Sequence, residues 1–567
     1  MLTRAQKTRV ALVIMGFLMV TATLWIRLLW LQVLNPSHWV SIARQQHLQV
    51  LELKPTRGAI LDRNLKPLAL SIRLTSVFAD PRHVKDPKSV ARRLAPVLNR
   101  PVAQLEEKLS DRGRGFVWLA RRIPYQAASQ IRAMRLSGVD VVMEPQRVYP
   151  QGYLASHLLG FAGMDTQGLE GLELYYDRIL KGEPGWRWLS RDARRRPVSA
   201  WEAPAVDPRD GLELVLTLDT AIQFFAEREL DRVYHESHAK GASIVIMDPV
   251  TGEILALANR PTFDPNEFSS VPPEVRRNRA ITDTFEPGSV FKVVTAALAL
   301  TQGVVRPEES FYCEEGAYPV AGHVLHDHQP HGWLTFREVI THSSNIGTVK
   351  VAMRLSPDSI VEGMRTFGFG VATGVELPGE VGGTVKPASQ WSKPSITAIP
   401  IGQEVTVTAL QLAQAICVVA NGGSLVKPWI VREIRHPSGT TVKSFKPTVI
   451  RQVISSGVAR ELKEILAGVV EEGTGKLAQV PGFRAAGKTG TAQKVEPSGV
   501  YSHSNFVASF VGFVPVEDPR LAIVVVVDEP RPIYYGGVVS APVFKRVATD
   551  ALAYLEQGTL KTAMAHE

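Results

Sequence analysis

The pattern of hydrophobic and polar positions separates one long apolar segment near the start of the chain from a large remainder. Residues 10–26 carry no charged side chain, and after Arg27 the apolar character continues through residue 34. A helix of about 20 apolar residues is long enough to cross a bilayer. Arg27 can extend its charged group to the membrane surface, beside two tryptophans. The pattern therefore predicts one transmembrane anchor over 10–34.

Basic residues before this segment indicate its orientation. Arg4, Lys7 and Arg9 precede the apolar run. Since positive flanks stay in the cytoplasm, a cytoplasmic tail over 1–9 and export of everything after the anchor are expected. A cleaved signal peptide is the alternative, but no A-x-A site follows the apolar run. We therefore expect a single-pass protein of the cell inner membrane whose main part is periplasmic.

After the anchor, residues 35–215 alternate short elements with turns and show no clear periodic core. A short amphipathic helix is predicted over 36–50, and further helices near 87–98 and 125–134. Turn-rich stretches with proline and glycine separate these elements. We interpret this region as an extended, non-catalytic pedestal domain.

From residue 216 the pattern changes to a helix over 220–238 followed by strands and many helices. The segment Asp248–Gly252 has the turn residues of a hairpin. The strand-like runs are 243–247, 253–259, 488–495, 506–513 and 521–527, with a terminal helix over 542–555. This order predicts an α+β domain over 216–556, in which helices flank a mostly antiparallel five-stranded sheet, and a tail over 557–567.

Composition excludes several classes of protein. The chain has 567 residues, of which 45% are hydrophobic and 21% charged, and these values argue against disorder and against a multi-span transporter. Its net charge of +9 is dispersed, so no nucleic-acid partner is expected. The two cysteines, Cys313 and Cys417, form no C-x-x-C pair and are expected to be buried apolar residues.

A candidate nucleophile and base lie at the start of an apolar helix. Ser289 and Lys292 are three residues apart in the segment EPGSVFK, so they share one face of the first helical turn. A serine hydroxyl needs a neighbouring base, and a desolvated lysine can supply one. Since S-x-x-K also occurs by chance, this motif alone does not establish an active site.

Two further motifs follow in order. Ser343 and Asn345 form an S-x-N, in which the hydroxyl can relay a proton and the amide can orient Lys292 and a substrate carbonyl. We expect Lys292 to act as the base, because no other titratable residue lies within one helical turn of Ser289.

The third motif opens a strand and reads Lys488-Thr489-Gly490-Thr491. Strand geometry places Lys488 and Gly490 on one face and the threonines on the other. Gly490 allows the strand to approach the active-site helix, Lys488 adds positive charge, and the threonines can bind a substrate carboxylate. The backbone N–H groups of Ser289 and Thr491 are the expected oxyanion hole.

Together the three motifs resemble the signature of penicillin-binding proteins and class A β-lactamases, with Ser344 in place of aspartate. Residues 57–64, 147–152 and 168–173 are similar to the pedestal motifs of class B penicillin-binding proteins. Leu65 and Val290 depart from the usual glycine and small hydroxyl residue. The chain most resembles the division-specific, FtsI-like type, with the elongation-specific type as the nearest alternative.

The resemblance implies a peptidoglycan D,D-transpeptidase that uses an acyl-serine intermediate on Ser289 in septal cell-wall synthesis. It implies stem peptides and lipid-linked precursors as substrates, β-lactam antibiotics as covalent inhibitors, and no cofactor. It also implies a multi-span glycosyltransferase and other division proteins as partners. The alternatives are a D,D-carboxypeptidase, a β-lactamase or antibiotic sensor, and a non-enzymatic division scaffold.

A histidine-rich segment raises the question of a metal site. His323, His326, His328 and His331 lie within nine residues, beside Asp327. Spacing alone is poor evidence for ligation, and the segment precedes the S-x-N motif, where members of the family carry a His- and Gly-containing loop. We therefore expect a structural or cleft-lining loop and no metal.

Overall fold

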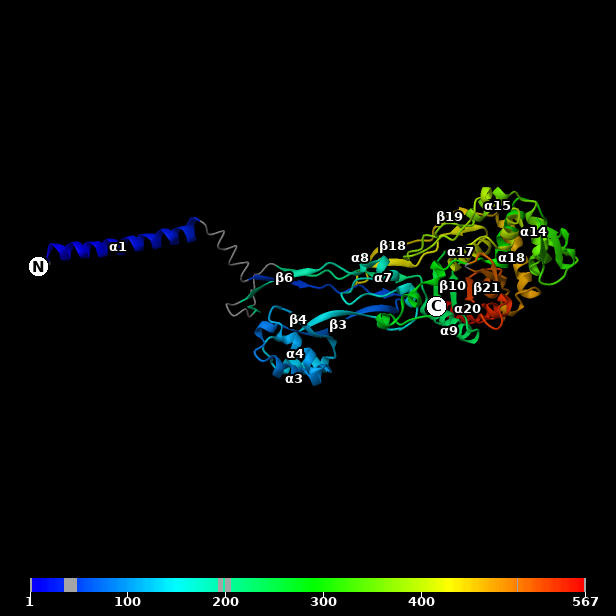
Figure 1. Ribbon diagram of the computed structural model, residues 1–567. Helices are drawn as coiled ribbons and strands as arrows, with labels where there is room; N and C mark the ends of the chain where they lie inside the picture. Colours follow the sequence, from blue (N-terminus) through cyan, green and yellow to red (C-terminus); the bar gives the residue numbers. More distant parts are fainter. Residues whose placement is uncertain (1–2, 35–47, 192–196, 199–204, 497, 565–567) are drawn as a thin grey trace. The chain divides into compact units, whose positions relative to one another are not determined.

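The computed structural model describes residues 3–34, 48–191, 197–198, 205–496 and 498–564 (Figure 1). The chain forms two compact units. The first consists of Met1–Thr56 and Gly182–Asp210, and the second of Arg57–Lys181 and Gly211–Glu567. Each unit is built from segments that are distant in sequence.

The first unit contains the predicted anchor and a small sheet. Helix α1 (Arg4–Leu29) continues in a π-helical turn to Leu34, and its 31 residues are long and apolar enough to cross a membrane. Strand β6 (Gly185–Arg191) pairs with β1 (Leu48–Leu53), β7 (Pro197–Val198) and β8 (Ala205–Val206). Most of the helix predicted over 36–50 lies outside the described residues. Its last three residues belong to β1, so the helix prediction is wrong there, because β6 offers that segment an antiparallel partner.

A seven-stranded mixed sheet forms the pedestal part of the second unit. Its order is β18-β17-β9-β2-β3-β4, with β5 also paired to β3, and the β2/β9 pair is parallel. The strands are β2 (Ile60–Leu61), β3 (Pro67–Ala79), β4 (Val117–Ile123), β5 (Val139–Val148), β9 (Glu213–Leu216), β17 (Val431–Arg435) and β18 (Thr441–Ser444). The sheet therefore joins residues near 60, 215 and 435, which the sequence pattern did not indicate.

Three helices cover one end of this sheet. They are α3 (Pro87–Leu98), α4 (Val102–Ser110) and α5 (Tyr125–Ala133), and they pack with β3 and β4 around a separate apolar core (Figure 1). The predictions near 87–98 and 125–134 are confirmed. Asp86 caps α3 by accepting a hydrogen bond from the Ser89 N–H at 3.1 Å.

Buried ion pairs hold the three pedestal motifs together. Glu173 is fully buried, and its carboxylate accepts hydrogen bonds from Arg57 Nε and Arg147 Nε, both at 2.6 Å. Arg57 also pairs with Asp177 at 2.6 Å, and Tyr149 donates its hydroxyl to Glu173 at 3.2 Å. Since the partners come from positions 57, 147–149 and 173–177, the motifs that are separate in sequence form one charge cluster.

The turn after the first pedestal motif is strained at Leu65. This residue has a φ of 65°, in the left-handed region, and its N–H donates to the Asp62 carbonyl at 3.0 Å. A side chain in this conformation costs about 1 kcal/mol relative to glycine. The departure from the usual glycine therefore leaves the turn in place, at a local energetic cost.

The five strands predicted for the second domain form one fully antiparallel sheet of order β11-β10-β22-β21-β20. They are β10 (Gly241–Met247), β11 (Ile254–Arg260), β20 (Ala486–Val495), β21 (Tyr501–Val514) and β22 (Leu521–Asp528). The α+β prediction and the hairpin between the first two strands are confirmed. Strand β20, which carries the K-T-G motif, lies at an edge of the sheet.

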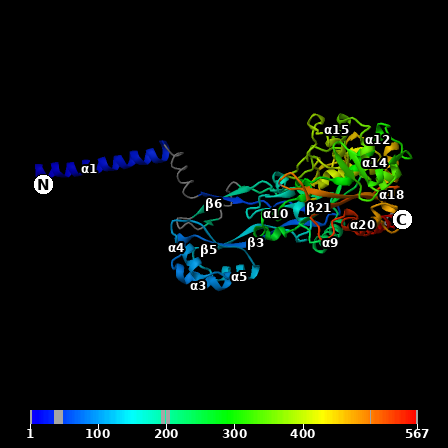
Figure 2. The same cartoon turned by 45° about the vertical axis from the view of Figure 1, so that its right-hand side comes forward.

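Helices cover both faces of this sheet. On one face α9 (Thr220–Glu236) and α20 (Ala541–Met564) pack on strand residues such as Ile244 and Phe510. On the other face lie α12 (Lys292–Thr301), α17 (Ala409–Ala420) and α18 (Ser456–Glu471). Figure 2 shows α12, α14 (Asn345–Ala352) and α15 (Pro357–Thr366) on the side of β21 opposite α9 and α20. The buried helix α12 thereby brings its N-terminal end to the edge strand β20.

Candidate active site

The candidate nucleophile lies in a tight turn that leads into α12. Ser289 belongs to a 3₁₀ turn, Gly288–Phe291, and Lys292 is the first residue of the α-helix. Gly288 has a φ of 57° and donates its N–H to the Gly402 carbonyl at 3.0 Å. Because Ser289 and Lys292 are one turn apart, the arrangement retains the predicted shared face.

The amine of Lys292 is fully buried and held by the S-x-N motif. Its Nζ lies 2.6 Å from the Ser343 carbonyl oxygen, 2.7 Å from Asn345 Oδ1 and 3.3 Å from Ser343 Oγ. Ser343 adopts a φ of 61°, which turns its carbonyl toward the amine in the loop before α14. The structure thus brings Lys292, Ser343 and Asn345 into direct contact.

Burial lowers the pKa of Lys292 to about 7, and the nearby Asp327 carboxylate opposes this shift. A neutral amine has two N–H donors, which can serve the two shortest contacts, and one lone pair. Near pH 7 the neutral form of Lys292 therefore offers a proton acceptor at this position. The arrangement suits a general base, one helical turn from a serine hydroxyl.

The second lysine of the signature lies beneath the same site. Lys488 is fully buried in β20, and its pKa is lowered well below the usual value by burial and then by the charge of Lys292. The positive charge expected of Lys488 from the sequence is therefore disfavoured by burial, and the charge of Lys292 adds to that effect.

The two threonines of the motif have partners beyond the sheet. Thr489 Oγ1 and Thr474 Oγ1 lie 2.7 Å apart, and Thr491 Oγ1 accepts the Gly536 N–H at 3.0 Å. Thr474 and Gly536 were not predicted, because neither residue stands in a recognisable motif. These contacts fix the rotamers of both threonines along the edge of β20.

Gly490 makes the closest approach between β20 and the serine turn. A Cβ atom at this position would lie 3.0 Å from the Pro287 carbonyl oxygen and 2.9 Å from a methyl group of Val290, and would overlap Ser509 Oγ. The strand can pass this close only without a side chain. Gly490 therefore allows β20 to lie against the turn that carries Ser289.

Replacing Gly490 with alanine is expected to slow acylation of Ser289 by about 100-fold, because a displacement of about 1 Å at a reacting group has that effect. The matched control is Gly457→Ala in α18, where the nearest atom is 3.8 Å from the added Cβ. The rate of labelling by a fluorescent penicillin measures both. Equal rates in the two variants would contradict this role of Gly490.

Asp327 is a site residue that the sequence motifs did not single out. Its carboxylate accepts hydrogen bonds from Ser344 Oγ at 2.6 Å and from the N–H groups of Asn345 and Ile346 at 2.5 and 3.0 Å. Ser344 replaces the aspartate of the S-D-N signature, and a separate segment here supplies a carboxylate to the same turn. The only signal in the sequence was its position in the histidine-rich segment.

The histidines of that segment point to different partners. His328 packs against Tyr535 with ring centroids 5.1 Å apart, His331 stacks on His342 at 5.5 Å, and His323 approaches Thr397 at 3.5 Å. Within the described residues, no group of three or more His, Cys, Asp or Glu side chains is placed to hold a metal ion. Cys313 and Cys417 are both buried, as expected.

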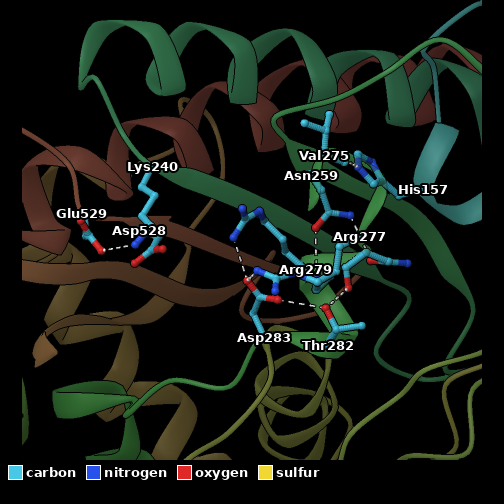
Figure 3. Close-up of polar contacts among 12 residues, drawn as sticks. His157, Lys240, Asn259, Val275, Arg277, Arg279, Thr282, Asp283, Asp528 and Glu529 are labelled. Atoms are coloured by element: carbon cyan, nitrogen blue, oxygen red, sulfur yellow. Dashed lines mark hydrogen bonds and ion pairs between the residues drawn. The ribbon is translucent and has the colours of Figure 1, made fainter. Parts of the chain in front are cut away.

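A cavity of about 490 Å³ lies against the segment that precedes Ser289. It is lined by residues that include Lys240, Asp283, Glu286, Thr406, Gln493 and Asp528. Figure 3 shows Arg277 and Arg279 directed toward Asp283, with ion pairs of 3.0 and 2.8 Å, and Lys240 directed toward Glu529 at 3.0 Å. Ion pairs therefore form much of the cavity wall.

Glu286 connects this cavity wall to the serine turn. Its Oε1 accepts the Glu404 N–H at 2.9 Å and the Tyr501 hydroxyl at 3.3 Å, while its buried Oε2 has no hydrogen-bond partner among the described residues. Burial raises the pKa of Glu286. The carboxyl thus links the turn before Ser289 to the loop at Glu404 and to the start of β21 at Tyr501.

Comparisons with known families match both parts of the chain. A model of the penicillin-binding protein transpeptidase domain matches residues 242–549, and a model of the penicillin-binding protein dimerisation domain matches residues 52–216. The first match contains all three motifs of the site, and the second contains the buried ion-pair cluster around Glu173.

Similar proteins extend over most of the chain. Stage V sporulation protein D of Bacillus subtilis is 38% identical over 93% of this chain and 83% of its own length. Peptidoglycan D,D-transpeptidase FtsI of Escherichia coli K12 is 35% identical over 96% of this chain and 91% of its own length. The crystal structure of penicillin-binding protein 3 of Mycobacterium tuberculosis with aztreonam has a TM-score of 0.69 at 30% identity, and covers 90% of this chain and 97% of that chain.

Proposed function

The chain belongs to the class B penicillin-binding proteins and is a serine-type peptidoglycan D,D-transpeptidase, and from this premise we propose that it cross-links stem peptides at the division septum. The observation that supports the chemistry most directly is the buried amine of Lys292, held by Asn345 one turn from Ser289, with a pKa of about 7. The similarity to FtsI supports the septal role.

In the proposed reaction, neutral Lys292 takes the hydroxyl proton of Ser289 as the oxygen attacks the carbonyl of the penultimate D-alanine. Backbone N–H groups of Ser289 and Thr491 stabilise the oxyanion. The peptide bond breaks, and the terminal D-alanine leaves with the proton on its amine. An amine of a neighbouring strand then attacks the acyl-serine, forms the cross-link and returns the proton to Ser289 through Lys292.

Binding of the donor peptide follows from the position of β20. An edge strand offers unpaired backbone groups, so an extended stem peptide can add alongside it. Thr489 and Thr491 are proposed to bind the terminal carboxylate, with Gly490 giving access. A β-lactam would occupy the same place and acylate Ser289, as the membership of this chain in the penicillin-binding protein family implies.

We extend the proposal to the surroundings of the enzyme. Helix α1, with its basic N-terminal flank, anchors the chain with residues 1–9 in the cytoplasm and the catalytic domain in the periplasm. The pedestal over 35–215 and the transpeptidase domain over 216–556 act as separate functional parts. A multi-span glycosyltransferase supplies the glycan strands from lipid-linked precursors, and other division proteins bind the anchor and pedestal.

Intact-mass spectrometry of the full-length chain in detergent tests the acyl-serine chemistry. After incubation with a penicillin, an adduct of one drug mass that persists for many minutes and is absent from Ser289→Ala is the expected result. A transient adduct with release of hydrolysed drug would instead indicate a β-lactamase. A folded chain that forms no adduct would favour the scaffold alternative.

Two further measurements separate the remaining alternatives. Incubation with a donor pentapeptide and an acceptor amine should yield the cross-linked product, whereas release of D-alanine with hydrolysis alone would indicate a carboxypeptidase. Depletion in the host should produce filaments without septa if the role is septal. Rounded cells would indicate the elongation-specific alternative.

A further inference from the structure

The carboxylate of Asp327 organises the start of α14 from a different part of the chain. It accepts the N–H groups of Asn345 and Ile346, which are the first two N–H groups of that helix and have no partner within it. It also accepts the hydroxyl of Ser344, which itself caps the helix by accepting the Gly347 N–H at 3.0 Å. Asp327 therefore fixes the turn from outside while Ser344 caps it from within.

The same segment sets the orientation of the Asn345 amide. Asn345 Nδ2 donates to the His326 carbonyl at 2.8 Å, which leaves Oδ1 facing the Lys292 amine at 2.7 Å. The backbone of Asn345 is held by Asp327 and its side chain by the neighbouring residue. Residues 326 and 327 thus decide which atom of Asn345 the lysine contacts.

The S-x-N turn that Asp327 holds is strained at Ser343. Ser343 has a φ of 61°, a conformation that residues other than glycine avoid, and its carbonyl lies 2.6 Å from Lys292 Nζ. A strained turn persists only where surrounding contacts hold it. The three hydrogen bonds to Asp327 are made by the residues directly after Ser343, and so they oppose relaxation of this turn.

The negative charge of Asp327 also acts on the Lys292 amine that the S-x-N turn holds. Burial acts on the amines of both Lys292 and Lys488, and Asp327 is the carboxylate whose charge raises the pKa of Lys292 against that effect. The other titratable groups around Asp327 are Cys313, whose pKa is raised by burial and then by this carboxylate, and the chain neighbours His326 and His328. The charge of Asp327 therefore offsets part of the effect of burial on the proposed base.

We propose that Asp327 is a positioning residue of the transpeptidase, which holds the S-x-N turn so that Ser343 and Asn345 keep the Lys292 amine in place beside Ser289. This inference rests on the proposed acyl-serine function. Asp327 acts through Asn345 and Lys292 and does not itself take part in bond formation.

The test is the pH dependence of acylation by benzylpenicillin in the full-length protein in detergent, from pH 5 to 9, together with the melting temperature. Asp327→Asn removes the charge and one acceptor. We expect the maximal rate to fall by about tenfold or more. The acid limb of the pH profile is the range in which the acylation rate rises with pH. It should move to lower pH by about one unit, because Lys292 loses a neighbouring anion and its pKa decreases.

A matched control is Asp219→Asn. Asp219 is also a buried carboxylate that caps a helix, accepting the N–H groups of Ala221 and Ile222 at the start of α9. This variant should lower the melting temperature without moving the acid limb. If Asp327→Asn behaves in the same way, with an unchanged limb and maximal rate, Asp327 is only a helix cap and the proposal is wrong.

Ser344→Ala provides a second variant in case Asp327→Asn does not fold. It removes one hydrogen bond to Asp327 but keeps the charge, so the maximal rate should fall by several-fold with the acid limb unchanged. An unchanged maximal rate would count against the proposal. If the wild-type chain forms no acyl-enzyme, the proposed function fails instead, and the two failures are therefore distinguishable.

Discussion

Replacing Lys292 with alanine is expected to lower the rate constant for acylation of Ser289 by about 10²- to 10⁴-fold, the contribution typical of a general base. The amine is buried and is held by Ser343 and Asn345. Its removal takes away the proton acceptor that lies one helical turn from the serine hydroxyl. The rate of covalent labelling by a penicillin measures the effect.

The wild-type rate should also depend on pH in a defined direction. Since the pKa of Lys292 is lowered to about 7, the amine is protonated below this pH and cannot accept the serine proton. Acylation should therefore rise as the pH increases from 5 to 7 and level off above about pH 8. Lys292→Arg should remain slow at every pH, because a guanidinium stays protonated.

Lys463→Ala is the matched control for this prediction. Lys463 lies in α18, and partial burial also lowers its pKa, yet it is not part of the site. This variant should acylate at the wild-type rate with the same pH profile. A Lys292→Ala variant that keeps its fold and its rate would mean that another group serves as the base.

Replacing Glu173 with alanine is expected to lower the free energy of unfolding by about 3–5 kcal/mol, because it leaves buried guanidinium groups without their counter-charge. Arg57 and Arg147 both pair with this carboxylate at 2.6 Å and are almost completely buried. The melting temperature of the full-length protein should fall by about 3–5 °C, because the unit that contains Glu173 has several hundred residues and a large unfolding entropy. Thermal unfolding followed by intrinsic fluorescence or circular dichroism measures it.

Glu183→Ala tests whether the effect depends on burial. Glu183 pairs with Arg209 at 3.4 Å, but both side chains are more than 70% exposed. Such a pair contributes little, so the melting temperature should change by less than about 2 °C. Equal shifts in the two variants would show that the Glu173 cluster is not a main support of the pedestal.

The sequence by itself determined the anchor, the order of the strands along the chain and the three motifs of the site. A long uncharged apolar run is typical of a membrane-spanning helix, and short runs of aliphatic and β-branched residues indicated β10, β11, β20, β21 and β22 close to their observed positions. The motifs were recognisable because each chemistry-bearing residue lies within four positions of its partners. Local spacing was sufficient for these features.

Only the tertiary structure decided which contacts join the motifs to one another and to other parts of the chain. The contacts of Lys292 with Ser343 and Asn345, of Thr489 with Thr474, and of the α14 turn with Asp327 join segments that are 15 to 53 residues apart. The contact of Arg57 with Glu173 joins segments 116 residues apart, and that of Arg147 with Glu173 joins segments 26 residues apart. Sequence patterns report local periodicity and spacing, whereas these contacts depend on burial and on the close approach of distant backbone, which exist only after the chain has folded.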